Sequence, residues 1–201
     1  MHADRQGKLI VFEGISGTGK ETQAKILKEF LAKKGIASTI VYHPSPELKE
    51  VLSKWRKERN IDNVSEAYFL LADRFNRVKE VIIPALNRGE WVICLRNWLS
   101  ALIYQAKSDK DRTWITKEFA RFEPKPDYLF YFDISPELAL QRINKRNRET
   151  GEPLGKFETI EILKEKHAKY FSVFQNFSHV AIDASESVIT INHVITSYIN
   201  I

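Results

Sequence analysis

Residues Lys8 to Gln23 read KLIVFEGISGTGKETQ. The first six residues are typical of a buried strand, and a glycine-rich loop and the start of a helix follow them. Gly14, Gly19 and Lys20 fit the phosphate-loop pattern, in which backbone amides cradle phosphates and the lysine reaches the β and γ phosphates. The last position of that pattern requires Ser or Thr, and here it is Glu21. The stretch therefore predicts a nucleoside triphosphate site with an unusual carboxylate beside it.

Outward from this loop, apolar segments alternate with segments of helical periodicity. We expect five strands, at Lys8–Glu13, Ser38–Tyr42, Trp91–Leu95, Tyr128–Ile134 and His179–Asp183. The expected helices run from the loop to Gly35 and then span Glu47–Arg59, Val64–Asn87, Trp98–Lys107, Thr113–Arg121, Pro136–Arg146, Glu158–Phe177 and a last segment from Ser187. Strands joined by helices predict an α/β fold, with a parallel sheet covered on both faces. Ligands of such sheets bind beyond the carboxyl ends of the strands, where the phosphate loop lies.

The composition is that of one globular unit. The chain has 201 residues, 43% of them hydrophobic and 28% charged, and we expect a single domain over residues 1–201. Its one cysteine, Cys94, excludes an internal disulfide framework and suggests a reducing compartment. No apolar run approaches the roughly 20 residues of a membrane span, and the polar start lacks a signal-peptide core. We therefore expect a cytoplasmic protein without a membrane partner.

The net charge of +5 is compatible with nucleic acid, acidic lipid or phosphorylated small molecules as partners. The densest basic stretches are KWRKER (Lys54–Arg59) and RINKRNR (Arg142–Arg148). Neither alternates with stacking aromatic side chains over a long surface, so we expect no nucleic-acid partner. The five histidines lack the spacing of metal ligands and no Ser or Cys nucleophile motif occurs, so zinc or hydrolase chemistry has little support.

Five further segments resemble, in order and spacing, the thymidylate kinases, a family of nucleoside monophosphate kinases. They are AYFLLADRFNRVKEVIIPAL (67–86), RGEWVICLRNWLSALIYQ (88–105), YLFYFDISPELALQRINKR (128–146), KFE (156–158) and IDAS (182–185). With the phosphate loop they cover nearly the whole chain. The resemblance implies a three-layer P-loop NTPase fold with a doubly wound sheet and a mobile lid at about residues 142–157. It also implies ATP and Mg²⁺, transfer of the γ-phosphoryl group to dTMP, and a homodimer.

On the donor side, the resemblance assigns ATP to the phosphate loop and the lid. The expected ATP-binding residues are Gly14, Ile15, Ser16, Gly17, Thr18, Gly19, Lys20, Glu21, Thr22, Arg142 and Ala184. Arg142 is expected to stack on adenine, with the Asp183–Ser185 stretch on the other side of the base. Arg142, Arg146 and Arg148 are expected to neutralise the transferred phosphoryl group, whose loose transition state needs cations. The expected hinges of lid closure are Gly151, Pro153 and Gly155.

On the acceptor side, Arg74 matches the family arginine that hydrogen-bonds the thymine edge, and Arg96 matches the arginine that clamps the phosphate under attack. Tyr104 matches a ring beneath the sugar, although helix packing explains it equally well. Glu158 matches a carboxylate near the acceptor. The expected acceptor-binding residues are Phe69, Leu70, Arg74, Arg96, Ser100, Tyr104, Gln105 and Phe157. The expected catalytic residues are Lys20, Arg96, Arg146, Arg148 and Glu158.

The chain also departs from the family pattern. Tyr42 stands where the family commonly has an arginine on the acceptor phosphate. Leu70 replaces a base-stacking phenylalanine, with Phe69 beside it. Leu95 replaces an aspartate close to magnesium, and Ser16 replaces an acidic residue of the loop.

Glu21 and Leu95 are interpreted together, because the first position gains a carboxylate and the second loses one. In one interpretation Glu21 ligates magnesium, whose charge removes the repulsion between the carboxylate and the phosphates. In the other, Glu21 faces solvent and is stabilised by the helix N-terminus, by about 0.3–1 kcal/mol.

Three alternative functions are open at this point. Tyr42 and Leu70 alter the acceptor pocket and admit another acceptor nucleotide. Loss of a phosphate-binding arginine suits a deoxynucleoside kinase, although Arg96 argues against it. The missing aspartate and loop hydroxyl also permit a nucleotide-binding regulator that has lost catalysis.

Overall fold

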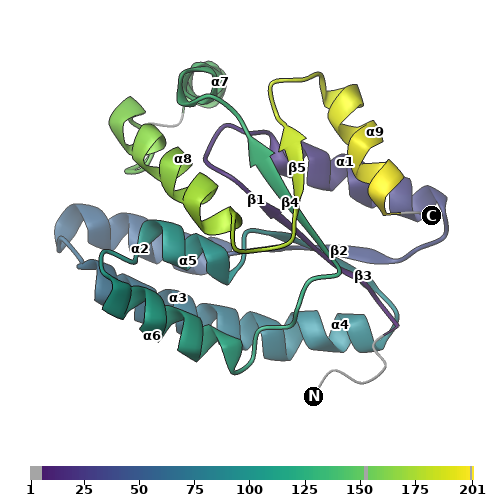
Figure 1. Cartoon of the computed structure of the whole chain (residues 1–201), viewed down its shortest axis with the longest axis horizontal. Helices are drawn as coiled ribbons and strands as arrows, with labels where there is room; N and C mark the ends of the chain where they lie inside the picture. The colour runs from purple at the N-terminus through teal and green to yellow at the C-terminus, as the bar shows by residue number, and fades with distance from the viewer. Residues whose placement is uncertain (1–5, 152–153, 200) are drawn as a thin grey trace.

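The computed structural model describes residues 6–151, 154–199 and 201. Within them, five parallel strands form one sheet in the order β2-β3-β1-β4-β5 (Figure 1). The strands are β1 (Leu9–Glu13), β2 (Ser38–Tyr42), β3 (Trp91–Leu95), β4 (Tyr128–Asp133) and β5 (Val180–Asp183). Each lies within one residue of its predicted range, and the expected α/β fold with a parallel sheet is confirmed.

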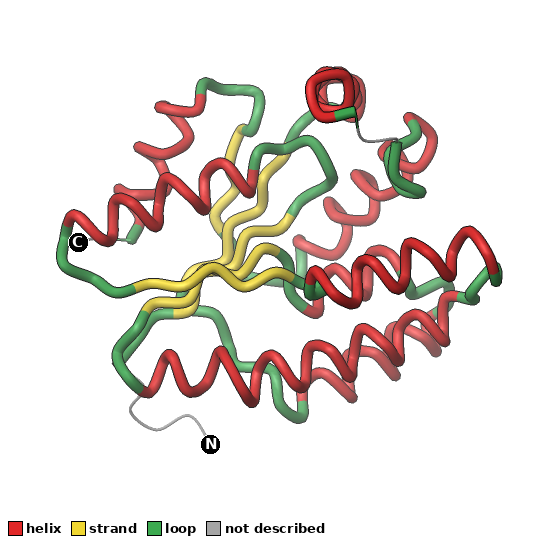
Figure 2. The backbone as a smooth tube through the Cα atoms, turned by 180° about the vertical axis from the view of Figure 1, so that it is seen from behind, coloured by secondary structure: helices red, strands yellow, loops and turns green. Residues whose placement is uncertain are grey.

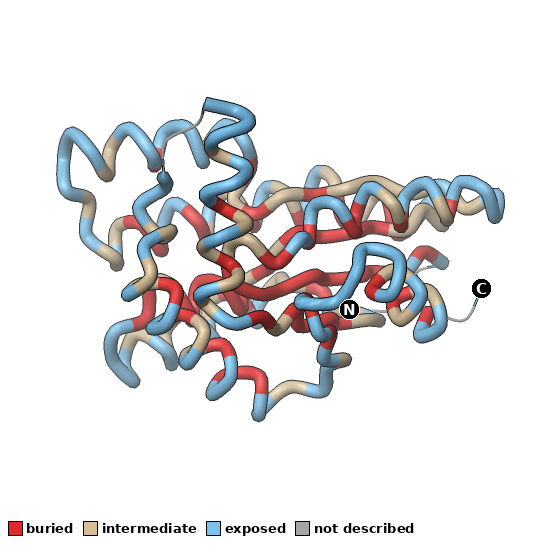
Figure 3. The backbone as a smooth tube through the Cα atoms, turned by 90° about the horizontal axis from the view of Figure 1, so that it is seen from above, coloured by how far each residue is buried: buried red, intermediate tan, exposed pale blue. Residues whose placement is uncertain are grey.

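β1 occupies the centre of the sheet because its residues can be buried on both faces. All five of its residues are buried, and Leu9 to Phe12 are completely enclosed. β3 and β4 flank it with apolar runs of their own, and Phe12 lies opposite Leu95 on one side and Phe130 on the other. A strand covered on both faces needs such a continuous apolar run. Figure 3 shows the buried segments passing through the middle of the molecule, with exposed helix turns outside them.

Helices cover both faces of this sheet. α1 (Lys20–Lys33) and α9 (Val188–Tyr198) lie together on one side, and α3 to α6 lie on the other (Figures 1 and 2). The remaining helices are α2 (Pro46–Glu58), α3 (Asn63–Arg77), α4 (Ile83–Asn87), α5 (Trp98–Tyr104), α6 (Asp109–Ala120), α7 (Pro136–Thr150) and α8 (Ile160–Phe174). Within the described residues, no helix combines the length and apolarity needed to cross a lipid bilayer.

The predicted helix over Val64–Asn87 is not regular along its whole length. α3 passes into a π-helical segment, η1 (Val78–Ile82), and then into α4, where Pro84 lies in the first turn. Proline lacks an N–H, and its ring clashes with the carbonyl four residues earlier in a regular α-helix. The wider π-turn before Pro84 relieves this conflict, and hydrophobic periodicity alone does not reveal it.

Other helices also differ from their predicted ends, and α6 and α7 differ most. α6 begins at Asp109 instead of Thr113, because Ser108 and Asp111 form a reciprocal capping box. α7 continues to Thr150, past the predicted end at Arg146, and stops where Gly151 adopts a φ of 73°. All three arginines of the predicted lid are therefore on one continuous helix.

Candidate active site

A cavity of about 980 Å³ lies at the carboxyl ends of the strands. Its wall combines the phosphate loop, the ends of β2 and β3, and parts of α2, α5, α7 and α9. The predicted site residues on this wall are Ser16, Gly17, Thr18, Gly19, Lys20, Glu21, Thr22, Leu70, Arg96, Ser100, Tyr104, Gln105, Arg142, Arg146, Phe157 and Glu158. The structure thus brings residues predicted for ATP and residues predicted for the acceptor to one cavity. The other predicted site residues, all described, lie off this wall: Gly14, Ile15, Phe69, Arg74, Arg148 and Ala184.

Lys20 begins α1, and its ammonium group is drawn into the preceding loop. Its Nζ donates hydrogen bonds to Gly14 O at 3.0 Å, to Ile15 O at 2.6 Å and to Thr18 Oγ1 at 2.8 Å. Burial lowers the pKa of Lys20 below the ordinary lysine value, and the nearby guanidinium of Arg96 lowers it further. Two cations are therefore held close together beside the loop, an arrangement that favours an anionic ligand.

The phosphate loop packs directly against α7. Gly17 has a φ of 82°, and a Cβ at this position would lie 2.5 Å from the carbonyl oxygen of Ala139 in α7. Only glycine adopts this left-handed conformation at low cost and also leaves room for the neighbouring helix. Because α7 carries Arg142 and Arg146, this close approach sets both side chains beside the loop.

Arg142 differs from its predicted arrangement. Its Nη1 donates to the carbonyl of Ala184 at 2.7 Å, so the guanidinium lies directly against the Asp183–Ser185 stretch. The adenine ring is predicted to lie between these two groups, which are in direct contact here. The hydrogen bond to Ala184 occupies an edge of the guanidinium and not a face, and Arg142 shares the cavity wall with Val188.

The other two lid arginines have separate surroundings. Arg146 forms an ion pair with Glu158 at 3.1 Å, and Glu158 also accepts a hydrogen bond from the Gly155 N–H at 2.8 Å. Arg148 lines a smaller hollow with Asn144, Asn147 and Leu154, outside the main cavity. Of the predicted hinges, Pro153 lies outside the described residues. Arg146 is thus the lid arginine that joins α7 to the segment before α8.

Arg96 directly follows β3 and has a φ of 71°, in the left-handed region that few non-glycine residues adopt. Its Nη1 donates to the Tyr170 hydroxyl at 2.5 Å and to Ser100 Oγ at 3.2 Å. Behind these hydroxyls lies the carboxylate of Glu13, which is 0% exposed. Burial alone would lower the pKa of Arg96, but the Tyr104 and Tyr170 phenols and the Glu13 carboxylate raise it above its ordinary value. Arg96 therefore stays cationic beside the cavity.

Glu13 and Tyr170 are site residues that the sequence interpretation missed. Glu13 ends an otherwise apolar strand directly before the phosphate loop, and a charge at a fully buried position is a signal that the sequence contains. Tyr170 gives no such signal, because its place on the apolar face of α8 is equally that of a core residue.

Aromatic rings and a buried ion pair form the wall near Tyr104. The Phe157 ring lies 5.1 Å from the Tyr104 ring and 4.8 Å from the Arg56 guanidinium. Arg56 also forms an ion pair with the buried Glu66, which accepts a hydrogen bond from Gln105 at 2.9 Å. On this side α2 contributes Lys49, Ser53, Arg56 and Lys57 to the wall. Part of the basic stretch Lys54–Arg59 therefore faces the cavity, which the sequence interpretation did not anticipate.

Arg74 is placed away from the cavity, unlike its predicted position against a base. Its side chain is 0% exposed and donates to Glu123 through Nε at 2.9 Å and Nη2 at 2.6 Å. Leu70, one turn earlier in α3, does line the cavity, whereas Phe69 packs against Trp55 with ring centroids 4.8 Å apart. A direct contact between Arg74 and a base would require its buried ion pair to open.

Glu21 lies on the cavity wall with 57% of its side chain exposed. Its Oε1 is 2.9 Å from Lys25 Nζ and accepts a hydrogen bond from the Tyr42 hydroxyl at 3.4 Å. The side chain of Leu95, on the same wall, has no atom that could ligate a metal. Within the described residues, no three His, Cys, Asp or Glu side chains gather in a way that could hold a metal ion. A magnesium ion fits here only if phosphates and water supply most of its ligands, with Glu21 as a single carboxylate.

Comparisons with known proteins identify relatives of this sequence. The family model for thymidylate kinase matches residues 12–195. A thymidylate kinase of Legionella pneumophila (strain Paris) is 36% identical over 194 residues, which cover 92% of this chain and 86% of the relative. A probable thymidylate kinase of Archaeoglobus fulgidus is 32% identical over 197 residues, covering 96% of this chain and 97% of the relative. A probable thymidylate kinase of Pyrococcus horikoshii is 36% identical over 152 residues, covering 72% and 74%. The chain belongs to the thymidylate kinase family.

Proposed function

We propose that this chain transfers the γ-phosphoryl group of ATP to dTMP and releases ADP and dTDP. The observation that carries the proposal is the single cavity that contains both the phosphate loop with Lys20 and the strand-end cation Arg96. Its volume of about 980 Å³ lies at the upper end of the range for ligand clefts, roughly 300–1,000 Å³. Two nucleotides can therefore meet there through their phosphates, as the transfer requires. Membership of the thymidylate kinase family supports dTMP as the acceptor.

On the donor side, the loop amides and Lys20 bind the β and γ phosphates of ATP. A phosphate oxygen of dTMP forms a bond to the γ phosphorus as the bond to the ADP oxygen breaks. Arg146 is the lid cation placed to neutralise this group, since it lines the cavity, where its side chain is 45% exposed and pairs with Glu158 on the same wall. Arg142, one turn earlier on the same side of α7, supports the adenine ring.

On the acceptor side, Arg96 binds the phosphate of dTMP, and the rings of Tyr104 and Phe157 form an apolar wall for sugar and base. Tyr42 supplies no cation here, and its hydroxyl is directed to Glu21. Other cations on the same wall take its place, namely Lys49 and Lys57, together with Lys25 and Arg56, which are paired with Glu21 and Glu66. This concentration of positive charge suits a phosphorylated acceptor better than an uncharged nucleoside.

We also propose Mg²⁺ as the ion that accompanies ATP. When bound with ATP, it would neutralise charge on the β and γ phosphate oxygens. Glu21 is the side chain placed to reach it, because its carboxylate is exposed on the cavity wall directly after Lys20. Lys25 and Tyr42 would orient this carboxylate.

An acceptor panel tests the proposed function. ATP consumption is coupled to detection of ADP in the presence of dTMP, dUMP, UMP or thymidine at equal concentrations. We expect dTMP to be the best acceptor, dUMP weaker and UMP weaker still, because the apolar wall of Tyr104 and Phe157 suits the thymine methyl group and a sugar without a 2′-hydroxyl. Thymidine should be inactive, since it offers no phosphate to Arg96. Strong turnover with thymidine and none with dTMP would replace this proposal with a nucleoside kinase.

We further propose that residues 1–201 act as one domain with a lid at about 142–157, and that the protein works in the cytoplasm. The family match over residues 12–195 supports a single unit. The single cysteine, Cys94, is buried and unpaired, which suits a reducing compartment.

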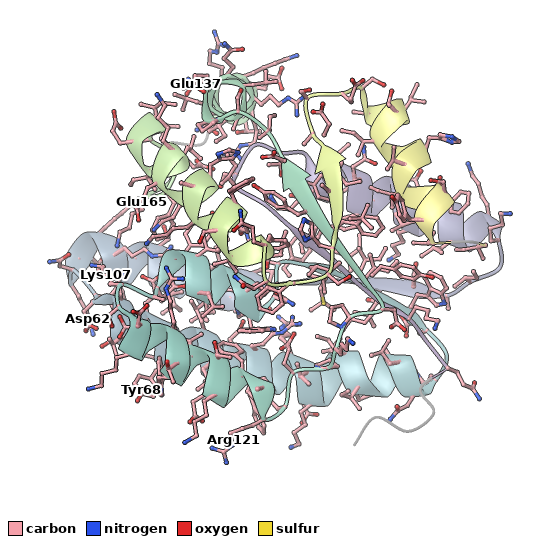
Figure 4. The ribbon with its side chains drawn as sticks, viewed as in Figure 1. Asp62, Tyr68, Lys107, Arg121, Glu137 and Glu165 are labelled. Atoms are coloured by element: carbon pink, nitrogen blue, oxygen red, sulfur yellow. The ribbon has the colours of Figure 1, made fainter. Side chains whose placement is uncertain are left out.

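A homodimer is the assembly that we propose, with α3 as its contact helix. Val64, Tyr68 and Phe75 recur on one side of α3 and are 46%, 55% and 50% exposed. Figure 4 shows Tyr68 at the outer edge of the molecule, directed away from the sheet. Tyr68 packs on Trp114 and Phe75 on Phe122, at centroid distances of 4.6 and 5.2 Å, so the apolar surface extends beyond α3. Exposed apolar patches of this kind commonly mark protein interfaces.

A further inference from the structure

Glu13 is the most deeply enclosed carboxylate near the phosphate loop, and it is the acceptor in each of its hydrogen bonds. Oε1 accepts from the Asn97 N–H at 2.8 Å. Ser100 Oγ donates to the same carboxylate at 2.8 Å, and the Tyr170 hydroxyl donates to Oε2 at 2.8 Å. A hydroxyl carries a single proton, so Ser100 and Tyr170 each donate their one hydrogen bond to Glu13.

Because both protons are directed to Glu13, the two hydroxyls can only accept hydrogen bonds from Arg96. Ser100 and Tyr170 are left with lone pairs, and Arg96 Nη1 donates to them at 3.2 and 2.5 Å. Glu13 itself is 3.8 Å from Nη1, so the carboxylate acts on the guanidinium mainly through the two hydroxyls. Every donor in this network therefore faces an acceptor: Arg96 donates to the two hydroxyls, and the hydroxyls donate to the Glu13 carboxylate.

The same contacts leave the rest of the guanidinium for the cavity. The bonds to Ser100 and Tyr170 both use Nη1, so Nε and Nη2 take no part in them. The Tyr104 ring lies 5.2 Å from the guanidinium carbon of Arg96. The backbone N–H of Arg96 donates a hydrogen bond to Phe12 O at 2.9 Å. The backbone of Arg96 is strained, with a left-handed φ of 71°, and this conformation sets the direction of its side chain. A guanidinium held at one edge can offer its other edge to two oxygens of a phosphate.

We propose that Glu13 is a positioning residue, which acts through Ser100 and Tyr170 to orient Arg96 toward the phosphate of the acceptor. This inference rests on the proposed function, because it assumes that Arg96 binds the dTMP phosphate. It differs from a purely structural role for Glu13, in which the network would only stabilise the fold. A positioning role affects ligands with an acceptor phosphate and spares ligands without one.

The test compares ligands in the Tyr170→Phe variant, which removes one hydroxyl and keeps the ring. The dissociation constant of dTMP should rise about tenfold by calorimetry, because Nη1 loses an acceptor and Glu13 loses a donor. The inhibition constant of thymidine and the dissociation constant of ATP should each stay within about twofold of wild type. Neither ligand presents an acceptor phosphate to Arg96. Glu13→Gln should give the same pattern, because it removes the charge that orients both hydroxyl protons and sets an NH₂ donor against the N–H of Asn97 or against the hydroxyls.

Tyr131→Phe is the matched control. The Tyr131 ring stacks on Tyr170 at 5.7 Å, but its hydroxyl donates to Asp133 instead of Glu13. It should bind dTMP like the wild type. In an Arg96→Ala background, Tyr170→Phe should have no further effect on dTMP, because residues that act through one group are not additive.

Three outcomes would overturn the inference: unchanged dTMP affinity in folded Tyr170→Phe and Glu13→Gln, an equal loss of thymidine affinity, or additive effects with Arg96→Ala. Each is distinct from failure of the proposed function. Wild-type protein that neither binds nor phosphorylates dTMP would remove both, whereas a wild-type dTMP kinase with indifferent variants would remove only the role of Glu13.

Discussion

Glu21 stands where a phosphate loop ordinarily offers a hydroxyl, and the structure shows what holds its carboxylate. Lys25, one helical turn later, lies 2.9 Å away, and the Tyr42 hydroxyl approaches from the end of β2. Exposure of the side chain agrees with the interpretation that Glu21 faces solvent, while its place on the cavity wall agrees with magnesium binding. Both interpretations therefore survive the geometry, and they differ in what magnesium does.

The prediction at this residue is a double-mutant cycle with Leu95. If Glu21 is the carboxylate on magnesium, Glu21→Ala should raise the magnesium concentration for half-maximal activity and leave magnesium-free ATP binding equal or tighter, because a negative charge near the phosphates is gone. Glu21→Ser with Leu95→Asp should recover activity better than either change alone. Activity is measured as a function of magnesium for the wild type, Glu21→Ala, Glu21→Ser, Leu95→Asp and the double variant. Additive effects without a change in magnesium dependence would show that Glu21 only faces solvent.

At the residue scale, the sequence predicts best where the backbone itself makes the site. Lys20 and the loop residues follow from a motif whose glycines and helix start determine the geometry. Arg74 does not, because its partner Glu123 lies 49 residues later and no local pattern links the two. Glu13 was visible as a charge in an apolar strand, but its function depends on Ser100 and Tyr170, which come from two other helices.

Among the elements, α7 determines which arginines reach the phosphate loop. The close approach of Ala139 to Gly17 anchors the first half of α7 to the phosphate loop. Because α7 remains helical to Thr150, the side chains in its second half point in different directions. Arg146 lies on the main cavity and Arg148 on the smaller hollow. The two were predicted together, and they lie about half a helical turn apart, so they point in different directions.

We predict that Arg146→Ala lowers kcat about a hundredfold, with smaller changes in the Michaelis constants, because its charge matters most in the transition state. Arg148→Ala is the matched control on the same helix and should remain much nearer the wild-type rate. Steady-state kinetics with ATP and dTMP check both variants. Equal losses in the two, or an Arg146→Ala defect confined to ATP binding, would contradict the role assigned to Arg146.

The elements themselves could be predicted closely where one signal dominates. The strands follow from apolar runs that suit the centre of a parallel sheet. The π-helical segment before Pro84 and the capping box at Ser108 could not be located by hydrophobic periodicity, because both depend on backbone hydrogen bonding. Together with the continuation of α7 to Thr150, those are the places where predicted and observed helices differ most.

At the scale of the whole molecule, the proposed dimer follows from the exposed apolar side of α3. Wild-type protein should sediment at twice the mass of the chain, and Tyr68→Lys should sediment as a monomer, because a charge would then be buried at the contact. Phe171→Lys is the control, since Phe171 is also exposed, at 60%, but belongs to α8. Wild-type protein that is monomeric at micromolar concentration, or a dimer that tolerates Tyr68→Lys, would contradict this assembly.

The central claim concerns the whole cavity, which should join ATP to dTMP. The most direct measurement is phosphorus NMR of the products from ATP, dTMP and magnesium, with wild-type protein and with Lys20→Ala. We predict ADP and dTDP in equal amounts from the wild type. The variant, confirmed as folded by thermal melting, should form almost none, because the γ-phosphate loses its cation. ADP without dTDP from the wild type, or unchanged dTDP formation by Lys20→Ala, would contradict the account.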